Sequence, residues 1–318
     1  MLFENFSAAQ NVLLWGGFAL AVVLGAVANK TNFCTMGAVS DWVNMGDTGR
    51  LRAWALAIAV AVLGVAGAEY MGWVNADAAF PPYRSAQLLW AENLFGGLLF
   101  GIGMTLASGC GNKTLVRLGG GNLKSLVVLA VAAIGSYLML WTGFYTAVFD
   151  VWMAPTAIDL SAFGIRSQAL GDIVGGANAA RMNVVLGVLG GLAIAAFVFS
   201  SRQFRSGFDN VLGGVVVGLA VVAGWALTAG SLGEAWKEYA AMTSTPPSRV
   251  ATQSFTFISP MGDLVRYLAT PAHFELVNFG IAALLGVIAG SLAWSLATGR
   301  LRLEWFRTGS DAASHVAG

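Results

Sequence analysis

Residues 11–28 read NVLLWGGFALAVVLGAVA, a stretch without a charged side chain. A helix of this length rises about 27 Å, close to the thickness of the hydrocarbon core of a bilayer. Similar apolar stretches recur, and the expected membrane spans are 11–28, 51–73, 88–107, 123–146, 183–201, 210–230 and 274–298. The sequence therefore predicts an all-α polytopic membrane protein, a helical bundle with about seven spans.

Composition supports the same class. Of the 318 residues, 57% are hydrophobic and only 10% are charged, whereas soluble domains carry about 25% charged residues. The 41 glycines and 11 tryptophans are typical of helices packed in lipid and anchored at its interface. A net charge of +1 provides no basic surface for nucleic acid. A soluble enzyme, a disordered chain and a nucleic-acid-binding protein are therefore excluded.

Basic residues are distributed unevenly between the two sides of the membrane. One side holds Lys30, Arg50, Arg52, Lys113, Arg117, Lys124, Arg202, Arg205, Arg300, Arg302 and Arg307, and the other holds Arg84, Arg166, Arg181, Lys237, Arg249 and Arg266. Loops rich in Lys and Arg remain in the cytoplasm. The first set is thus expected to be cytoplasmic, with the N-terminus on the outer side.

Two parts of the chain resemble each other. Residues 16–23, GGFALAVV, correspond to residues 213–222, GGVVVGLAVV. Farther along, Met36-Gly37 corresponds to Met261-Gly262, which places Cys34 opposite Ser259. An odd number of spans separates the two copies, so they enter the membrane from opposite sides. This pattern predicts an inverted repeat of the kind found in transporters.

The repeat divides the chain into three parts. Residues 1–150 form a first repeat of four spans, residues 151–205 a linking loop and span, and residues 206–318 an incomplete second repeat. Two complete copies and the link would make nine spans. We therefore expect the chain to be a truncated version of a longer protein, or else a natural short form that a partner chain completes.

Both cysteines lie in polar breaks between apolar stretches. Cys34 follows the first span directly, in the segment 29–37, NKTNFCTMG. Cys110 lies between Gly109 and Gly111, and glycines on both sides allow a ligand to approach the backbone closely. Two thiols in such breaks, one per break of the first repeat, indicate a binding site more than core packing.

A short helix is expected to begin directly after Cys110. Asn112, Lys113 and Thr114 would form its first turn, where free amides and the positive end of the helix dipole favour an anion. Lys113 and Arg117, one turn apart, add positive charge. Thr35 and Ser259 could contact an anion at the other breaks, although helix capping is the commoner role of such residues.

Several alternatives remain for the thiols. Either cysteine could be a small apolar filler, and a disulfide between them is possible. His273 and His315 show no spacing with the cysteines that suits a metal site, so neither metal nor cofactor is expected. A catalytic nucleophile needs a base, and no histidine lies near either cysteine in the sequence. Because a thiol is a weak donor and a soft acceptor, direct contact with a soft, sulfur-bearing anion fits best.

At the Cys34 segment, the Gly109-Cys110-Gly111 loop and the glycine-rich spans, the chain resembles the YeeE/YedE family of bacterial inner-membrane sulfur transport proteins. The resemblance implies an hourglass of nine spans with short re-entrant helices, arranged as an inverted repeat, and thiosulfate uptake past a series of cysteine thiols. In an inner-membrane protein, the outer side expected from the loop charges would make the N-terminus periplasmic. Cys34 and Cys110 match two of the three family motif cysteines. The third belongs to a second Gly-Cys loop, which would follow Gly318.

The predicted function is transport, not enzymatic catalysis, with Cys34 and Cys110 as the relay for thiosulfate or a related anion. The alternative is a membrane-bound thiol protein that holds a persulfide on Cys110 and delivers sulfur to a cytoplasmic carrier protein. A subunit without a site is a third possibility. Glu69 and Glu92 are weak candidates for energy coupling, since carboxylates close to a membrane interface usually snorkel.

The sequence also predicts the location of four tryptophans and the structure of two further segments. Trp141, Trp152, Trp225 and Trp236 are expected to anchor the protein at the membrane interfaces. Residues 242–248 are expected to form an outer loop, and residues 299–318 a basic, loop-like tail.

Overall fold

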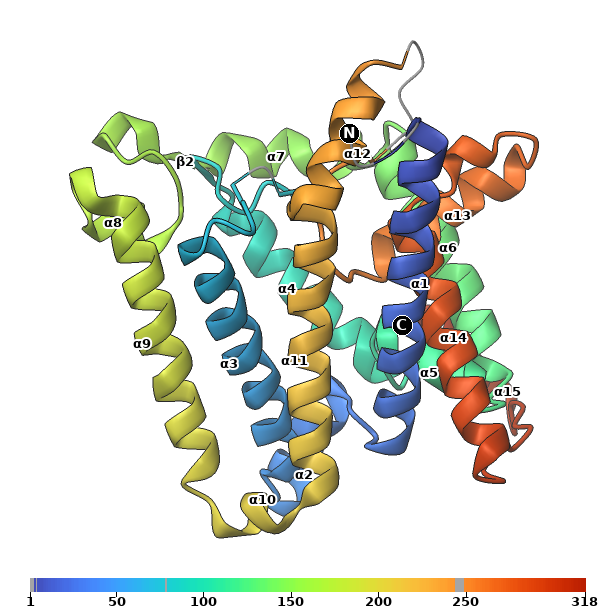
Figure 1. Cartoon of the computed structure of the whole chain (residues 1–318). Helices are drawn as coiled ribbons and strands as arrows, with labels where there is room; N and C mark the ends of the chain where they lie inside the picture. Colours follow the sequence, from blue (N-terminus) through green and yellow to red (C-terminus); the bar gives the residue numbers. More distant parts are fainter. Residues whose placement is uncertain (1–2, 4, 78, 244–248) are drawn as a thin grey trace.

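Seven apolar helices form the body of the molecule (Figure 1). The computed structural model describes residues 3, 5–77, 79–243 and 249–318. Within these residues, the helices long and apolar enough to span a membrane are α1 (Phe6–Lys30), α3 (Gly49–Tyr70), α4 (Trp90–Leu106), α6 (Lys124–Trp141), α9 (Ala179–Phe199), α11 (Phe208–Ala229) and α14 (Phe279–Ala297). They match the seven predicted spans, and the predicted fold class, an all-α polytopic membrane protein, is confirmed.

Shorter elements connect the long helices. They are α2 (Thr35–Met45), α5 (Gly111–Gly119), α7 (Val151–Met153), α8 (Leu170–Val174), α10 (Arg202–Ser206), α12 (Ser231–Ala241), α13 (Ile258–Ala269), α15 (Gly309–Ala317), and the single turns η1 (Thr146–Asp150), η2 (Ala154–Thr156), η3 (Leu160–Phe163), η4 (Gly176–Asn178) and η5 (Phe274–Leu276). The antiparallel strands β1 (Gln87–Leu88) and β2 (Ile158–Asp159) pair with each other. Of these short helices, α2 and α5 begin directly after Cys34 and Cys110, and α13 lines the cavity at Cys110.

The same turn ends α1 and α4 and sets the two cysteines. Asn32 and Ser108 adopt left-handed backbone conformations (φ 51° and 59°), and in each case the next amide bonds to the carbonyl five residues back, which is the Schellman pattern of helix termination. Two residues beyond each turn lies a cysteine in an extended conformation, as the N-cap of the next short helix. Each polar break of the sequence is therefore a helix-ending turn followed by a short helix that has a cysteine at its N-cap.

Long helices pack against each other in two close pairs. α1 runs along α14, α3 runs along α11, and α1 also contacts α11. Glycines allow this approach, because a Cβ added at Gly25 would collide with the carbonyl oxygen of Val287, and one at Gly290 would collide with that of Val22. A core of Leu24, Leu115, Met261, Val287 and their neighbours joins α1, α5, α13 and α14.

Two structural expectations are wrong. Residues 309–317, part of the expected tail loop, form α15, which packs on α4 and α6, with Asp311 paired to Lys124 at 2.7 Å. Trp236 is only 2% exposed and packs on Ala9 and Leu13, since α12 folds back onto α1. Residues 244–248 of the predicted outer loop lie outside the described residues.

Candidate functional site

Cys34 is a buried thiol at the N-terminus of α2. Its Sγ accepts a hydrogen bond from the amide of Gly37 (3.3 Å), so the sulfur takes the capping position of a serine oxygen. The guanidinium group of Arg50 lies against Gly37, where an added Cβ would collide with Nη1. Arg50 also pairs through two nitrogens with both carboxylate oxygens of Asp41. A fixed cation therefore stands beside the first thiol.

Cys110 lines a cavity of about 160 Å³ between α4, α5, α6 and the start of α13. The cavity is largely apolar, with Phe100, Val128, Ile258 and Met261 in its wall. Gly111 leaves space for Ile258, since an added Cβ would lie 2.8 Å from its Cδ1 and the Ile258 side chain would have to shift. Gly109 lines the same cavity, so the glycines on either side of the thiol create space around it.

Lys113 connects the two breaks. It lies three residues after Cys110 on α5, and its Nζ donates a hydrogen bond to Oδ1 of Asn32 (3.3 Å), which lies two residues before Cys34. One turn later, Arg117 donates to the carbonyl of Ser108 (2.9 Å). The two breaks thus lie together around the basic side chains of α5.

A second cavity, of about 320 Å³, begins at Lys113 and lies at the end of the bundle where α1 and α14 terminate. The charged residues of its described lining are Lys113, Arg117, Arg300, Arg302 and Glu304. The one carboxylate, Glu304, accepts a hydrogen bond from Asn122 (2.7 Å). This basic cavity concentrates positive potential next to the thiols, which favours an anion.

The remaining predicted residues are placed differently. Thr35 begins α2. Thr114 is buried, and its hydroxyl donates to the carbonyl of Cys110 (3.0 Å), which is a local structural role. Asn112 has a buried Oδ1 that bonds to nothing in the described part of the chain. Ser259, at the start of α13, bonds to Arg249 (3.1 Å) and not to a residue around the thiols.

Two residues of the site were missed in the sequence. Arg50 was counted among the loop charges, and only the fold places it on the α2 N-terminus. His315 lines the Cys110 cavity from α15, although no histidine lies near either cysteine in the sequence. No local signal identifies these residues, because each is brought in by packing between distant segments. Both cysteines are free thiols, and no metal-binding group of His, Cys, Asp or Glu occurs among the described residues.

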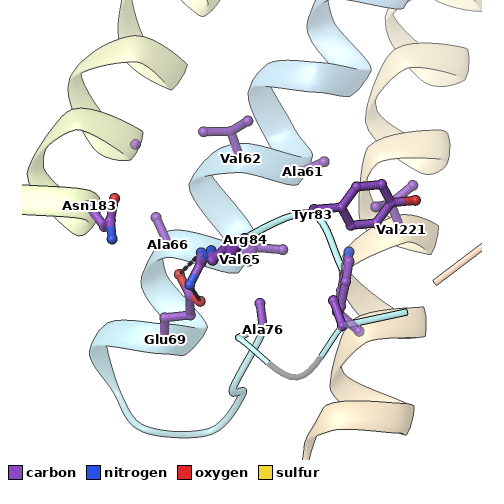
Figure 2. A pocket seen from close by; sticks show the side chains of 13 residues that line it. Ala61, Val62, Val65, Ala66, Glu69, Ala76, Tyr83, Arg84, Asn183 and Val221 are labelled. Carbon is purple, nitrogen blue, oxygen red and sulfur yellow. Dashed lines mark hydrogen bonds and ion pairs between the residues drawn. The ribbon is translucent and has the colours of Figure 1, made fainter. Parts of the chain in front are cut away.

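Glu69 lies in a different cavity, of about 320 Å³, between α3, α9 and α11 (Figure 2). Figure 2 shows its carboxylate turned towards Arg84, and the two form an ion pair at 2.8 Å. Arg84 also pairs with Asp77 at 2.7 Å, near the end of α3. Glu69 is thus a paired carboxylate away from the thiols.

Known proteins share sequence similarity with this chain. The family model described as Sulphur transport matches residues 30–318, which include both cysteines and the basic cavity. The chain belongs to the sulphur transport family. The thiosulfate transporter TsuA of Escherichia coli (strain K12) is 29% identical over 128 residues, which make up 40% of this chain and 34% of the relative. The match thus spans about a third of that relative's length, and the resemblance predicted from the sequence is confirmed at the level of the family.

Proposed function

We propose that this chain carries thiosulfate, or a related sulfur-containing anion, into the cell across the bacterial inner membrane. The observation that carries the proposal is the pair of thiols, Cys34 and Cys110, held at the starts of two short helices, with Lys113 of the second helix bonded to Asn32 just before the first. The named activity of TsuA is in keeping with this substrate.

The chemistry of the pair suits passage more than tight binding. A thiol makes weak hydrogen bonds with the terminal sulfur of thiosulfate, and Lys113 and the first-turn amides of α5 offset the negative charge. Conduction requires contacts strong enough to admit the ion and weak enough to release it. Two soft contacts in succession, with a cation beside both, meet that requirement.

The direction of transport follows from the charge distribution. Positive-inside orientation places the basic cavity of Lys113, Arg117, Arg300 and Arg302 on the cytoplasmic side and the N-terminus in the periplasm. An anion that leaves the thiols would then enter a region of positive potential that opens inward. The favourable potential would draw the ion away from the membrane centre.

We also propose that residues 1–150 and 206–318 are inverted copies joined by residues 151–205. The reciprocal packing supports this assignment, since exchange of α1 with α11 and of α3 with α14 converts the α1–α14 pair into the α11–α3 pair. The contact between α1 and α11 would lie on the pseudo-twofold axis. The site of Cys34 then has a counterpart at Ser259.

Growth and uptake test the proposal. In cells that lack other thiosulfate transporters, the chain is expected to support growth on thiosulfate as sole sulfur source and uptake of [35S]thiosulfate. Variants with Cys34 and Cys110 changed to Ala should lose both. Normal growth of the doubly substituted protein would overturn the thiol relay.

Mass spectrometry separates transport from the alternative function. If Cys110 holds sulfur as a persulfide for a cytoplasmic carrier protein, its thiolate will attack the outer sulfur of thiosulfate, the S–S bond of the ion will break and sulfite will leave. The protein treated with thiosulfate will then carry one additional sulfur atom on Cys110. The transport proposal predicts an unmodified thiol after the same treatment.

A further inference from the structure

A largely buried arginine, Arg249, lies in the segment between α12 and α13. These two helices are at the opposite end of the bundle from the end of α14 (Figure 1). The side chain of Arg249 is 12% exposed, and its Nε lies 3.0 Å from Oδ2 of Asp263. Nη1 donates a hydrogen bond to Oγ of Ser259 (3.1 Å). Ser259 and Asp263 belong to the first turns of α13, so a cation, a hydroxyl and a helix N-terminus converge at one point.

The surroundings hold this guanidinium group in place. Asp263 also accepts hydrogen bonds from Asn278 (2.8 Å) and from the indole of Trp141 (3.0 Å), so its carboxylate has a full set of partners. The guanidinium group lies 5.3 Å from the ring centroid of Phe80 and 5.7 Å from that of Trp141. Trp141, expected as an interfacial anchor, is thus part of a preorganised polar cluster.

The backbone of Arg249 is in a conformation shared with the two thiol breaks. In residues 3, 5–77, 79–243 and 249–318, the non-glycine residues with positive φ are Asn32, Ser108 and Arg249. The first two lie two residues before Cys34 and Cys110. At Asn32 and Ser108 this conformation belongs to a helix-ending turn, and at Arg249 it occurs in the segment between α12 and α13.

Arg249 forms part of the wall of a cavity of about 420 Å³. Of the described residues that line it, the charged ones are Arg249 and Lys237, both cations, and Phe80 is in the same wall. Lys237 bonds to Glu234 (2.7 Å) and to Thr252 (2.8 Å). Glu234 is 52% exposed, so water weakens its hold on the ammonium group.

Both halves of the proposed repeat place an arginine–aspartate pair beside the start of a short helix, although Arg50 follows its helix, α2, and Arg249 precedes its helix, α13. On the first half, Arg50 pairs with Asp41 beside the thiol of Cys34. On the second, Arg249 pairs with Asp263 beside the hydroxyl of Ser259. A guanidinium group and a hydroxyl are matched to oxyanion oxygens, whereas a thiol suits a soft sulfur atom.

We propose that Arg249, Ser259 and Lys237 form an oxyanion-binding site at the outer mouth of the path. The site takes the oxygen end of a divalent, tetrahedral sulfur oxyanion before the sulfur end meets the thiols. Its place on the transport path rests on the proposed function, but binding of the anion does not. Since the site contains no thiol, it accepts sulfate as well as thiosulfate, and discrimination between them falls to the cysteines.

Equilibrium binding of [35S]sulfate to the purified full chain in nanodiscs tests the site directly. Saturable binding is expected, with competition by unlabelled thiosulfate. Ser259→Ala, Lys237→Gln and Arg249→Lys should each weaken it by about tenfold, because each removes a hydrogen bond to a charged ligand. Ser259→Thr, which retains the hydroxyl, should bind as the unsubstituted chain does. Arg181→Gln, which alters an exposed cation on the same side, is the matched control.

The outcomes separate this site from the transport proposal. Absence of saturable sulfate binding would overturn the site even if thiosulfate uptake were normal. Unchanged affinity in the Ser259→Ala, Lys237→Gln and Arg249→Lys variants, each shown to be folded by size-exclusion chromatography, would overturn it as well. Sulfate binding that persists when Cys34 and Cys110 are both changed to Ala supports it. Intact sulfate binding without any thiosulfate uptake supports the site and contradicts the transport function.

Discussion

The ammonium group of Lys113 donates a hydrogen bond of 3.3 Å to the side chain of Asn32, which lies 81 residues earlier in the sequence. This contact joins the turn before Cys34 to the helix that begins at Cys110. The two thiol-bearing breaks are therefore in direct contact, and Lys113 is the residue at which to disturb that contact.

Replacement of Lys113 by Gln should lower thiosulfate uptake by about tenfold, equivalent to about 1.4 kcal/mol of lost stabilisation. The substitution removes the positive charge beside the two breaks, and the shorter Gln side chain also gives up the hydrogen bond to Asn32. Initial rates of [35S]thiosulfate uptake, corrected for the amount of protein in the membrane, measure the effect. Lys30→Gln, which alters a surface pair with Asp209, should leave the rate unchanged. Equal rates for both variants would remove Lys113 from the path.

Cysteine-to-serine and cysteine-to-alanine changes separate capping from transport at Cys34. Both should abolish uptake, because both remove the soft sulfur atom. Only Cys34→Ala should also lower stability, by about 0.5–1 kcal/mol, since it removes the acceptor for the Gly37 amide. Thermal unfolding in detergent is the measurement. Cys110 makes no such capping bond, so Cys110→Ala should cost less stability than Cys34→Ala.

The cavity at Cys110 can be closed and reopened with two substitutions. Gly111→Ala places a Cβ 2.8 Å from Cδ1 of Ile258, so uptake should fall. Ile258→Val removes that carbon atom, and the double variant should recover a substantial part of the rate. A double-mutant cycle on uptake rates quantifies the coupling. Additive losses would show that the contact does not control the cavity.

Acid should weaken the attachment of α15. The hydrogen bond from Lys124 holds the pKa of Asp311 below its ordinary value of 3.8. A lowered pKa in the folded state means that the stabilisation is complete above about pH 4 and is lost as the pH falls through the folded-state value. Asp311→Asn should therefore lower the unfolding midpoint at about pH 7, and the gap to the unsubstituted chain should close towards about pH 2. A gap that does not change with pH would contradict this contribution.

Much of the fold follows from local chemistry. The apolar stretches predict the seven helices, and the polar, glycine-containing segments around Cys34 and Cys110 predict where the chain breaks. These features depend on a few neighbouring residues, because hydropathy, helix termination and capping act over about one turn. The expectation of a loop-like tail over residues 299–318 is wrong for a related reason. The position of α15 depends on its packing on α4 and α6 and not on its composition.

The sequence by itself therefore determined that this is a helical membrane protein with two thiols at polar breaks. Only the tertiary structure decided which charges serve those thiols. Arg50 reaches Gly37, Lys113 reaches Asn32, and His315 comes to the Cys110 cavity from the last helix. Arg249 likewise meets Asp263 and Ser259 only because α13 folds back into the bundle. Such contacts depend on how closely the glycine-bearing faces of distant helices approach, and that distance is a property of the packed bundle.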